Sequence, residues 1–220
     1  MLLIALALAQ TPPQTPEQAW VEGDIATAST GWADRIDAGE VSGDLYYNLG
    51  NALVVQGRSP EAVLAYRRAQ LLSPRDGDIH ANLDHARRDT RDRIEAAPPL
   101  NPLSPREQGL LAAVMFAAAG LIATRSRPAA AVLTIPGVVA VVGTWLQISA
   151  FGSSAVVLAD AEVRSAGGGG VALFELHPGA EVALEQQVGD MSQVALPDGR
   201  RGWMPSAALG VIDPRLPAPR

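Results

Sequence analysis

The chain has 220 residues, 17 of them basic and 23 acidic, and a formal net charge of -6. A mildly acidic chain without a basic stripe excludes nucleic acid as a predicted partner. The absence of Cys excludes disulfides, thiolate metal sites and a Cys nucleophile.

The first predicted segment is a short apolar run, residues 1–9, which ends in the small-x-small pattern Ala7-Leu8-Ala9. This pattern is typical of a secretion signal, although the run lacks basic residues at its start. The alternative is an N-terminus without a targeting role. Residues 10–16 are rich in Pro and are predicted to form a tether.

Residues 17–97 contain an internal repeat with a period of 34 residues. For example, Asn48-Leu49 recurs as Asn82-Leu83, and Ala28 recurs as Ala62. The period and the order of residue types are the signature of tetratricopeptide repeats, carried by Tyr46, Leu49, Gly50, Leu53, Ala62, Tyr66, Ala69 and Pro74. The small residues are expected where the two helices of a repeat touch. Arg87 and the charges around it are predicted to form the solvated face of a capping helix.

The first helix of each repeat is expected to line a concave groove for a partner. The candidate binding residues on this groove are Tyr47, Asn48, Asn51, Val54, Asn82 and His85. Amide side chains could hydrogen-bond the backbone of an extended peptide. The alternative is that the repeated Asn residues only tie neighbouring helices together. Both interpretations stay open, because a buried Asn needs a partner in either case.

A linker, residues 98–107, leads to two uncharged apolar segments, residues 108–124 and 128–150. About 20 apolar residues are needed to span a bilayer, so the pair is predicted to form a transmembrane hairpin. Arg125 and Arg127 in the loop predict that the loop is cytoplasmic and that both flanking domains lie on the periplasmic side of a bacterial inner membrane. The alternative, a buried globular hairpin, is disfavoured because the flanking segments offer little apolar surface to cover it.

Residues 153–212 are predicted to form a small β barrel, with a tail at residues 213–220. Five strand-like segments are separated by turns: Ala155–Val163, Val171–Leu176, Ala180–Gln186, Gln193–Leu196 and Arg200–Met204. The region resembles a bacterial SH3-like domain, whose Gly-Trp pair is matched by Gly202-Trp203. Met191 stands where such domains usually carry Trp, so an aromatic polyproline groove is not expected. Trp203 is a secondary candidate contact, although a core role is favoured.

The sequence predicts no enzyme, no cofactor and no metal site. His80 and His85 are five residues apart, a poor spacing for one metal ion, and His177 lies in a Pro-Gly turn. The glycine run 167–170 lacks the Lys-Ser/Thr of a phosphate-binding loop. No nucleophile elbow is present. A hydrolase with an unrecognised site is kept as an alternative.

The string LYYNLGNAL…EAVLAYRRAQLLSPRDGDIHANLDHAR, followed by two apolar helices and a small β domain, resembles the BatE-type proteins of the bacterial aerotolerance (Bat) operon. The resemblance implies a link to stress tolerance, with von Willebrand A-domain Bat proteins and a MoxR-type ATPase system as partners.

The predicted fold class is therefore multidomain: an all-α tetratricopeptide array, a two-helix transmembrane hairpin and an all-β SH3-like barrel. The predicted function is a non-enzymatic envelope adaptor, anchored in the lipid bilayer, that binds other envelope proteins. The alternative is a cell-wall-associated module whose SH3-like domain contacts peptidoglycan.

Overall fold

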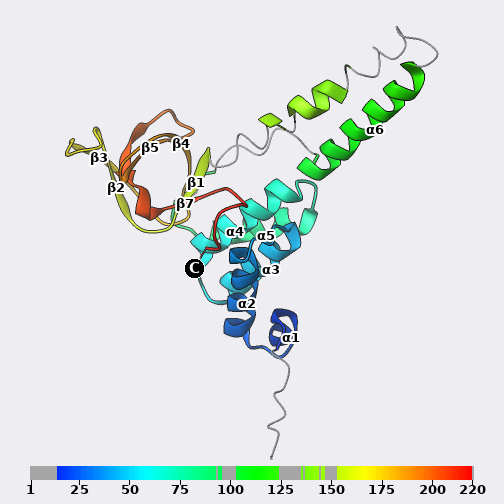
Figure 1. Cartoon of the computed structure of the whole chain (residues 1–220). Coiled ribbons are helices and arrows are strands. Elements are labelled where there is room, and N and C mark those ends of the chain that lie inside the picture. Colours follow the sequence, from blue (N-terminus) through cyan, green and yellow to red (C-terminus); the bar gives the residue numbers. More distant parts are fainter. Residues whose placement is uncertain are drawn as a thin grey trace, which may run out of the picture.

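The computed structural model describes residues 14–92, 94–95, 103–123, 135, 137–143, 145–146 and 153–219. Helices dominate the first half of the described chain and one antiparallel sheet forms the second half (Figure 1). The α-helices are α1 (Pro16–Val21), α2 (Ile25–Asp37), α3 (Gly43–Val55), α4 (Ser59–Leu72), α5 (Gly77–Arg88) and α6 (Pro105–Ala123).

Local capping signals set the starts of several helices. Thr15 and Gln18 form a reciprocal capping box at α1, and the Asp24 side chain accepts a hydrogen bond from the Thr27 amide at the start of α2. Asp76 caps α5 in the same way. At the end of α3, Gly57 adopts a left-handed conformation with φ of 73°, which glycine reaches without steric cost.

Helices α1–α5 pack against one another in chain order and are called the helical stack (Figure 1). Leu49 and Leu53 of α3 belong to the same buried cluster as Tyr66 of α4. A Cβ atom at Gly50 would lie only 2.6 Å from the Tyr66 ring, so glycine permits this close approach. The 34-residue recurrence corresponds to a structural recurrence, because α3 and α5 start at Gly43 and Gly77.

The sheet has seven strands in the order β3-β2-β6-β5-β4-β1-β7. Their bounds are β1 (Ser154–Val157), β2 (Ala161–Arg164), β3 (Ala172–Leu176), β4 (Glu181–Val188), β5 (Met191–Ala195), β6 (Arg201–Pro205) and β7 (Leu209–Val211), with a 3-10 turn at Ser206–Ala208. The segment predicted as one strand, 155–163, is two strands. β1 pairs with β4 and β7, whereas β2 pairs with β3 and β6.

The sheet packs directly on the helical stack through α4. Every residue from 62 to 70 is buried, because α3 and α5 cover one side of α4 while β1 and β7 contact another. Val156 of β1 and Ile212 after β7 belong to the same buried cluster as the helical core. Gly210 of β7 lies so close to Leu64 that a Cβ atom there would collide with it.

This shared core overturns the predicted fold class. The helices and the sheet form one mixed α/β domain, not an all-α tetratricopeptide array with a separate all-β SH3-like barrel. An independent array would expose the outer side of α4 to solvent, and here that side lies against the sheet.

The predicted transmembrane hairpin is also wrong. The 19-residue α6 carries Arg106 and Glu107 in its first turn, so its apolar part is shorter than the roughly 20 residues that a span requires. Across the described residues, no helix combines the length and apolar character needed to cross a membrane. The predicted inner-membrane location depended on that hairpin and is therefore wrong as well.

Several predicted segments lie wholly or partly outside the described residues: 1–9, 10–16, 98–107 and 128–150. The described part of the last segment runs antiparallel to α6. A Cβ atom at Gly137 would lie 3.2 Å from the Phe116 ring, and one at Gly143 would lie 3.5 Å from Gln108 Oε1. In Figure 1, α6 projects away from the helical stack.

Candidate functional site

Three helices contribute polar side chains to one hydrogen-bonded cluster, the tyrosine–asparagine network of Tyr47, Asn51, Tyr66 and Asn82. The Tyr66 hydroxyl donates to Asn51 Oδ1 at 2.7 Å. Asn82 Nδ2 donates to the same oxygen at 2.9 Å and to the Tyr47 hydroxyl at 3.2 Å. The two tyrosine rings are tilted by 51° with centroids 6.1 Å apart. The network therefore fixes α3, α4 and α5 relative to one another.

The network leaves one amide donor and one carbonyl acceptor unused. Asn51 Oδ1 accepts two hydrogen bonds, while Asn51 Nδ2 has no partner among the described residues. Asn82 has the reverse pattern, because its Nδ2 donates twice while its Oδ1 has no partner within the same part of the chain. Both side chains are only partly buried. A peptide group offers the matching carbonyl and N–H.

The network is electrically neutral at ordinary pH. Burial raises the pKa of Tyr66, and the neighbouring Tyr47 raises it further. The phenol therefore stays protonated and continues to donate to Asn51. A neutral site suits a neutral peptide group, because neither partner has to lose the hydration shell of a full charge on binding.

The structure brings together three of the predicted binding residues, Tyr47, Asn51 and Asn82. Val54 is partly buried and packs on the helical core, and Asn48 is partly buried outside the network. His85 is exposed, with Nδ1 3.5 Å from the Arg88 guanidinium. The two hydrogen bonds of Asn82 agree with the alternative interpretation, in which this residue ties neighbouring helices together.

Trp203 lies in β6, away from the network. It is partly buried and sits beside Gly167, where a Cβ atom would be 3.1 Å from the indole ring. It does not belong to the buried cluster inside the sheet, which includes its neighbour Met204. Phe174, the nearest aromatic residue in sequence, is covered by the Arg200 guanidinium at 4.6 Å from the ring centroid.

A second polar cluster was missed by sequence reasoning. Glu181 at the start of β4 is fully buried, with Arg67 Nε 2.9 Å from its Oε2 and Arg87 Nη2 2.6 Å from its Oε1. The predicted solvated face therefore fails at Arg87, whose side chain is 13% exposed. The available signal was the Arg67-Arg68 pair, which interrupts the apolar run from residue 62 to residue 69.

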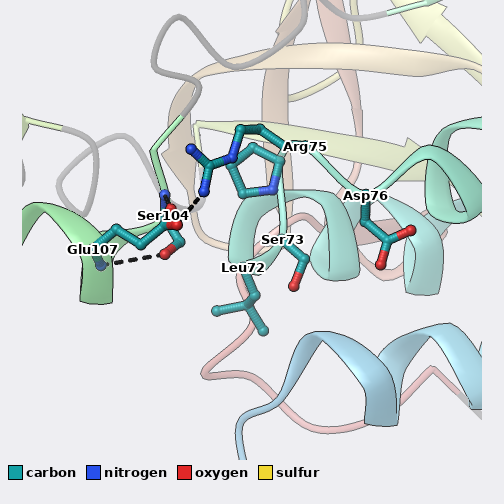
Figure 2. A pocket seen from close by; sticks show the side chains of 7 residues that line it. Leu72, Ser73, Arg75, Asp76, Ser104 and Glu107 are labelled. Carbon is teal, nitrogen blue, oxygen red and sulfur yellow. Dashed lines mark hydrogen bonds and ion pairs between the residues drawn. The ribbon is translucent and has the colours of Figure 1, made fainter.

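A shallow pocket of about 200 Å³ lies where the end of α4 meets the start of α6 (Figure 2). Arg75 forms an ion pair with Glu107 across it. The Glu107 carboxylate also accepts from the Ser104 amide at 2.9 Å, and the Glu107 amide donates to Ser104 Oγ at 3.3 Å. These polar groups satisfy one another's hydrogen bonds. Their contacts attach α6 to the helical stack and leave few polar groups in the pocket for a ligand.

The histidines have partners other than metal ligands. His80 contacts Gln70 Nε2 at 3.0 Å and the Pro74 carbonyl at 2.9 Å. His177 Nδ1 lies 3.0 Å from Asp92. In the part of the chain that the structure describes, no three His, Asp or Glu side chains come together as metal ligands.

Comparison with known proteins supplies no relative. No protein-family model matches the chain, and no curated protein or solved structure matches it either. The resemblance to BatE-type proteins therefore stays a prediction, and the function has to be inferred from the geometry.

Proposed function

We propose that the protein is a non-enzymatic adaptor that binds an extended segment of a partner protein on the surface formed by Tyr47, Asn51 and Asn82. The observation that supports this is the pair of unused groups, Asn51 Nδ2 and Asn82 Oδ1. Asn51 Nδ2 would donate to a peptide carbonyl of the partner, and Asn82 Oδ1 would accept from a peptide N–H.

The network prepares these two amides for binding. The Tyr66 hydroxyl holds Asn51, and Asn51 and Tyr47 together hold Asn82. Because the side chains are already ordered, a partner does not have to freeze them when it binds. Each neutral hydrogen bond contributes about 1 kcal/mol, so two of them support a weak, reversible interaction.

A large exposed apolar surface on α6 also supports an adaptor. Leu110 and Leu121 are each 68% exposed, and Val114 is 58% exposed. Clustered apolar side chains of this size mark interaction surfaces in folded proteins. α6 would therefore supply a second contact, beside the polar contact at the helical stack.

The resemblance implies which partners to test. They are von Willebrand A-domain Bat proteins and a MoxR-type ATPase, each purified and immobilised separately. Capture of an A-domain protein would support the adaptor proposal. Sedimentation of the chain with purified murein, without capture of either protein, would instead favour the cell-wall module.

The sharpest test of the site is Asn51→Asp. This change keeps the oxygen that accepts from Tyr66 and Asn82, and replaces the unused amide donor by an acceptor. We expect peptides selected by the wild-type protein from a displayed library to bind the variant about tenfold more weakly, as measured by fluorescence anisotropy. Alanine is a poorer choice, because it would leave the buried Tyr66 hydroxyl without its acceptor.

The control is Gln56→Glu, the same amide-to-acid change at the exposed C-cap of α3, where the amide donates only a long 3.4 Å hydrogen bond to the Ile25 carbonyl. It should leave peptide affinity unchanged. Equal peptide affinity of wild type and Asn51→Asp would show that the network is not the binding site. A library that yields no binder would contradict the proposed function of this surface.

A further inference from the structure

Residues 213–219, called the tail segment, leave the sheet after β7 and run across the helical stack (Figure 1). The segment contains three prolines, Pro214, Pro217 and Pro219. Its hydrogen bonds to the helices are made by its main chain, and the side chain of Ala218 belongs to the buried helical core. It is therefore held like a bound peptide.

Two helix side chains donate to the main-chain carbonyls in and next to the tail segment. The Tyr46 hydroxyl donates to the Pro214 carbonyl at 2.9 Å. The Arg68 guanidinium donates to the Val211 carbonyl at 2.9 Å and to the Pro217 carbonyl at 2.6 Å. Carbonyl recognition suits this segment, because proline has a carbonyl group but no N–H.

Every N–H group of the tail segment has a hydrogen-bond acceptor. The amides of Arg215 and Leu216 donate to the side chain and the carbonyl of Asp213, at 2.9 and 3.2 Å. The Ala218 amide donates to Asp37 Oδ1 of α2 at 2.8 Å. The helices thus place donors opposite carbonyls of the tail segment. They also place one acceptor, Asp37, opposite the Ala218 N–H, which has no acceptor within the segment itself.

The two donors belong to a built site inside the protein. Tyr46 is fully buried and Arg68 is 3% exposed, with its guanidinium 5.7 Å from the Tyr46 ring centroid. Burying a guanidinium among carbonyl groups is costly unless its hydrogen bonds are made. Within the tail segment, Arg215, Leu216 and Pro217 are exposed, whereas Pro214, Ala218 and Pro219 are buried. The site therefore holds the backbone together with these three buried side chains.

We propose that Asp37, Tyr46 and Arg68 form a binding site for an extended, proline-containing peptide, and that residues 213–219 are its resident ligand. A proline-containing segment of a partner protein with the same spacing of carbonyls can compete for the site. This proposal is independent of the tyrosine–asparagine network. It assigns proline recognition to the helices rather than to the sheet, where aromatic groove residues are lacking.

The test uses the full chain with a protease site inserted between Ile212 and Asp213. Cleavage of the folded protein keeps the buried Ile212 in the body and turns residues 213–220 into a separate peptide. After dialysis, a fluorescently labelled peptide of sequence DPRLPAPR is added and its anisotropy is measured. We expect saturable binding and recovery of the uncleaved protein's circular dichroism spectrum.

Two peptide variants test the contribution of the prolines and that of an exposed side chain. A peptide with alanine in place of all three prolines should bind at least about tenfold more weakly. It gains N–H groups without acceptors, loses its extended preorganisation and loses the buried rings of Pro214 and Pro219. A peptide with Leu216→Ala should bind like the parent, because that side chain is exposed.

Two protein variants locate the site. Arg68→Lys should weaken binding about tenfold or more, because lysine lacks the planar fork that reaches two carbonyls, and Tyr46→Phe should weaken it about fivefold. The proposal is overturned if the cleaved protein unfolds when the peptide leaves, or if the alanine peptide binds as well as the parent. Unchanged affinity in both protein variants would also overturn it.

Discussion

Among the ion pairs that the described residues form, the Glu181 carboxylate is the only one with no exposed surface. Two guanidinium groups, from Arg67 and Arg87, neutralise it at the junction of helices and sheet. A buried charge is expensive to desolvate, and removing one member of a buried pair leaves the others uncompensated. These three residues are therefore among the most sensitive positions for stability.

Glu181→Gln should lower the free energy of unfolding by about 3–5 kcal/mol. Arg67 and Arg87 lose their shared buried carboxylate, and Arg87 keeps only the exposed carboxylates of Asp84 and Glu95. The measurement is urea denaturation followed by circular dichroism. The matched control is Glu162→Gln, whose side chain is 40% exposed in its pair with Arg164 and should cost at most about 1 kcal/mol. Equal losses in the two variants would contradict the importance of the buried cluster.

Asp213 predicts a pH dependence. Burial raises the pKa of its carboxyl, but hydrogen bonds from Arg215 and the charges of Arg215 and Arg68 outweigh burial and hold that pKa below its usual value. The stabilisation is therefore present above the unfolded pKa, about 4, and is lost as pH falls through the folded pKa. The stability difference between wild type and Asp213→Asn should shrink between pH 6 and pH 2.

The control for this titration is Asp160→Asn, at an exposed carboxylate in the turn after β1 with no hydrogen bond among the described residues. Its stability difference from wild type should stay nearly constant over the same range. A constant difference for Asp213→Asn as well would show that Asp213 does not stabilise the fold through its charge.

Sequence reasoning found part of the candidate site because its residues are close in the chain. Asn82 is the repeat equivalent of Asn48, and Asn51 lies one helical turn after Asn48, so periodicity pointed to both. The groups around Glu181 and the tail segment could not be found this way. Their partners are 94 to 181 residues apart, and no local pattern records such a contact.

At the scale of elements, the contact of α3 with α4 depends on Gly50. Gly50→Ala should destabilise the protein by about 2 kcal/mol relative to Gly77→Ala, because its Cβ atom would press on the buried Tyr66 ring. Nothing lies within 4 Å of the Cβ position at Gly77, so alanine there should be neutral or slightly stabilising. Thermal unfolding of both variants gives the comparison, and equal melting temperatures would contradict the packing.

The exposed face of α6 predicts association. Leu110→Gln combined with Leu121→Gln should leave the unfolding midpoint unchanged, because both side chains are largely exposed. The same variant should bind less of an apolar dye such as ANS and scatter less light at high concentration. Unchanged dye binding would mean that this face is covered in solution.

Helix positions followed from the sequence better than strand positions did. The 34-residue period marks helices locally, and the structure adds the caps at Thr15 and Asp76. The run 155–163 was predicted as one strand, since a short apolar run does not show where the chain turns. β7 was missed because its three residues are too few for a periodic signal.

For the whole molecule, the predicted division into domains failed for a physical reason. Composition separates a helical half from a β half, and each half alone suggests a familiar small fold. The contacts that unite them, from α4 to β1 and β7, depend on which face of α4 is covered. The sequence shows that α4 is apolar on several sides but does not show what covers each side.

The shared core predicts one unfolding transition. Amides in α3 and α4 and amides in β4 and β5 should lose hydrogen-exchange protection at the same urea concentration, because Val156 and Ile212 belong to the helical core. Mass spectrometry of peptic fragments gives both midpoints in one experiment. Two separate midpoints in the wild-type protein would restore the view of independent domains.

The distance along the chain between Arg87 and Glu181 also matters while the protein is being made. The carboxylate is added 94 residues after this arginine, a delay on the order of ten seconds at ordinary translation speeds. Throughout that interval the newly made helices carry two hydrated guanidinium groups on the face where the sheet will dock. The two charges therefore keep this face of the nascent chain hydrated until Glu181, which neutralises them, leaves the ribosome.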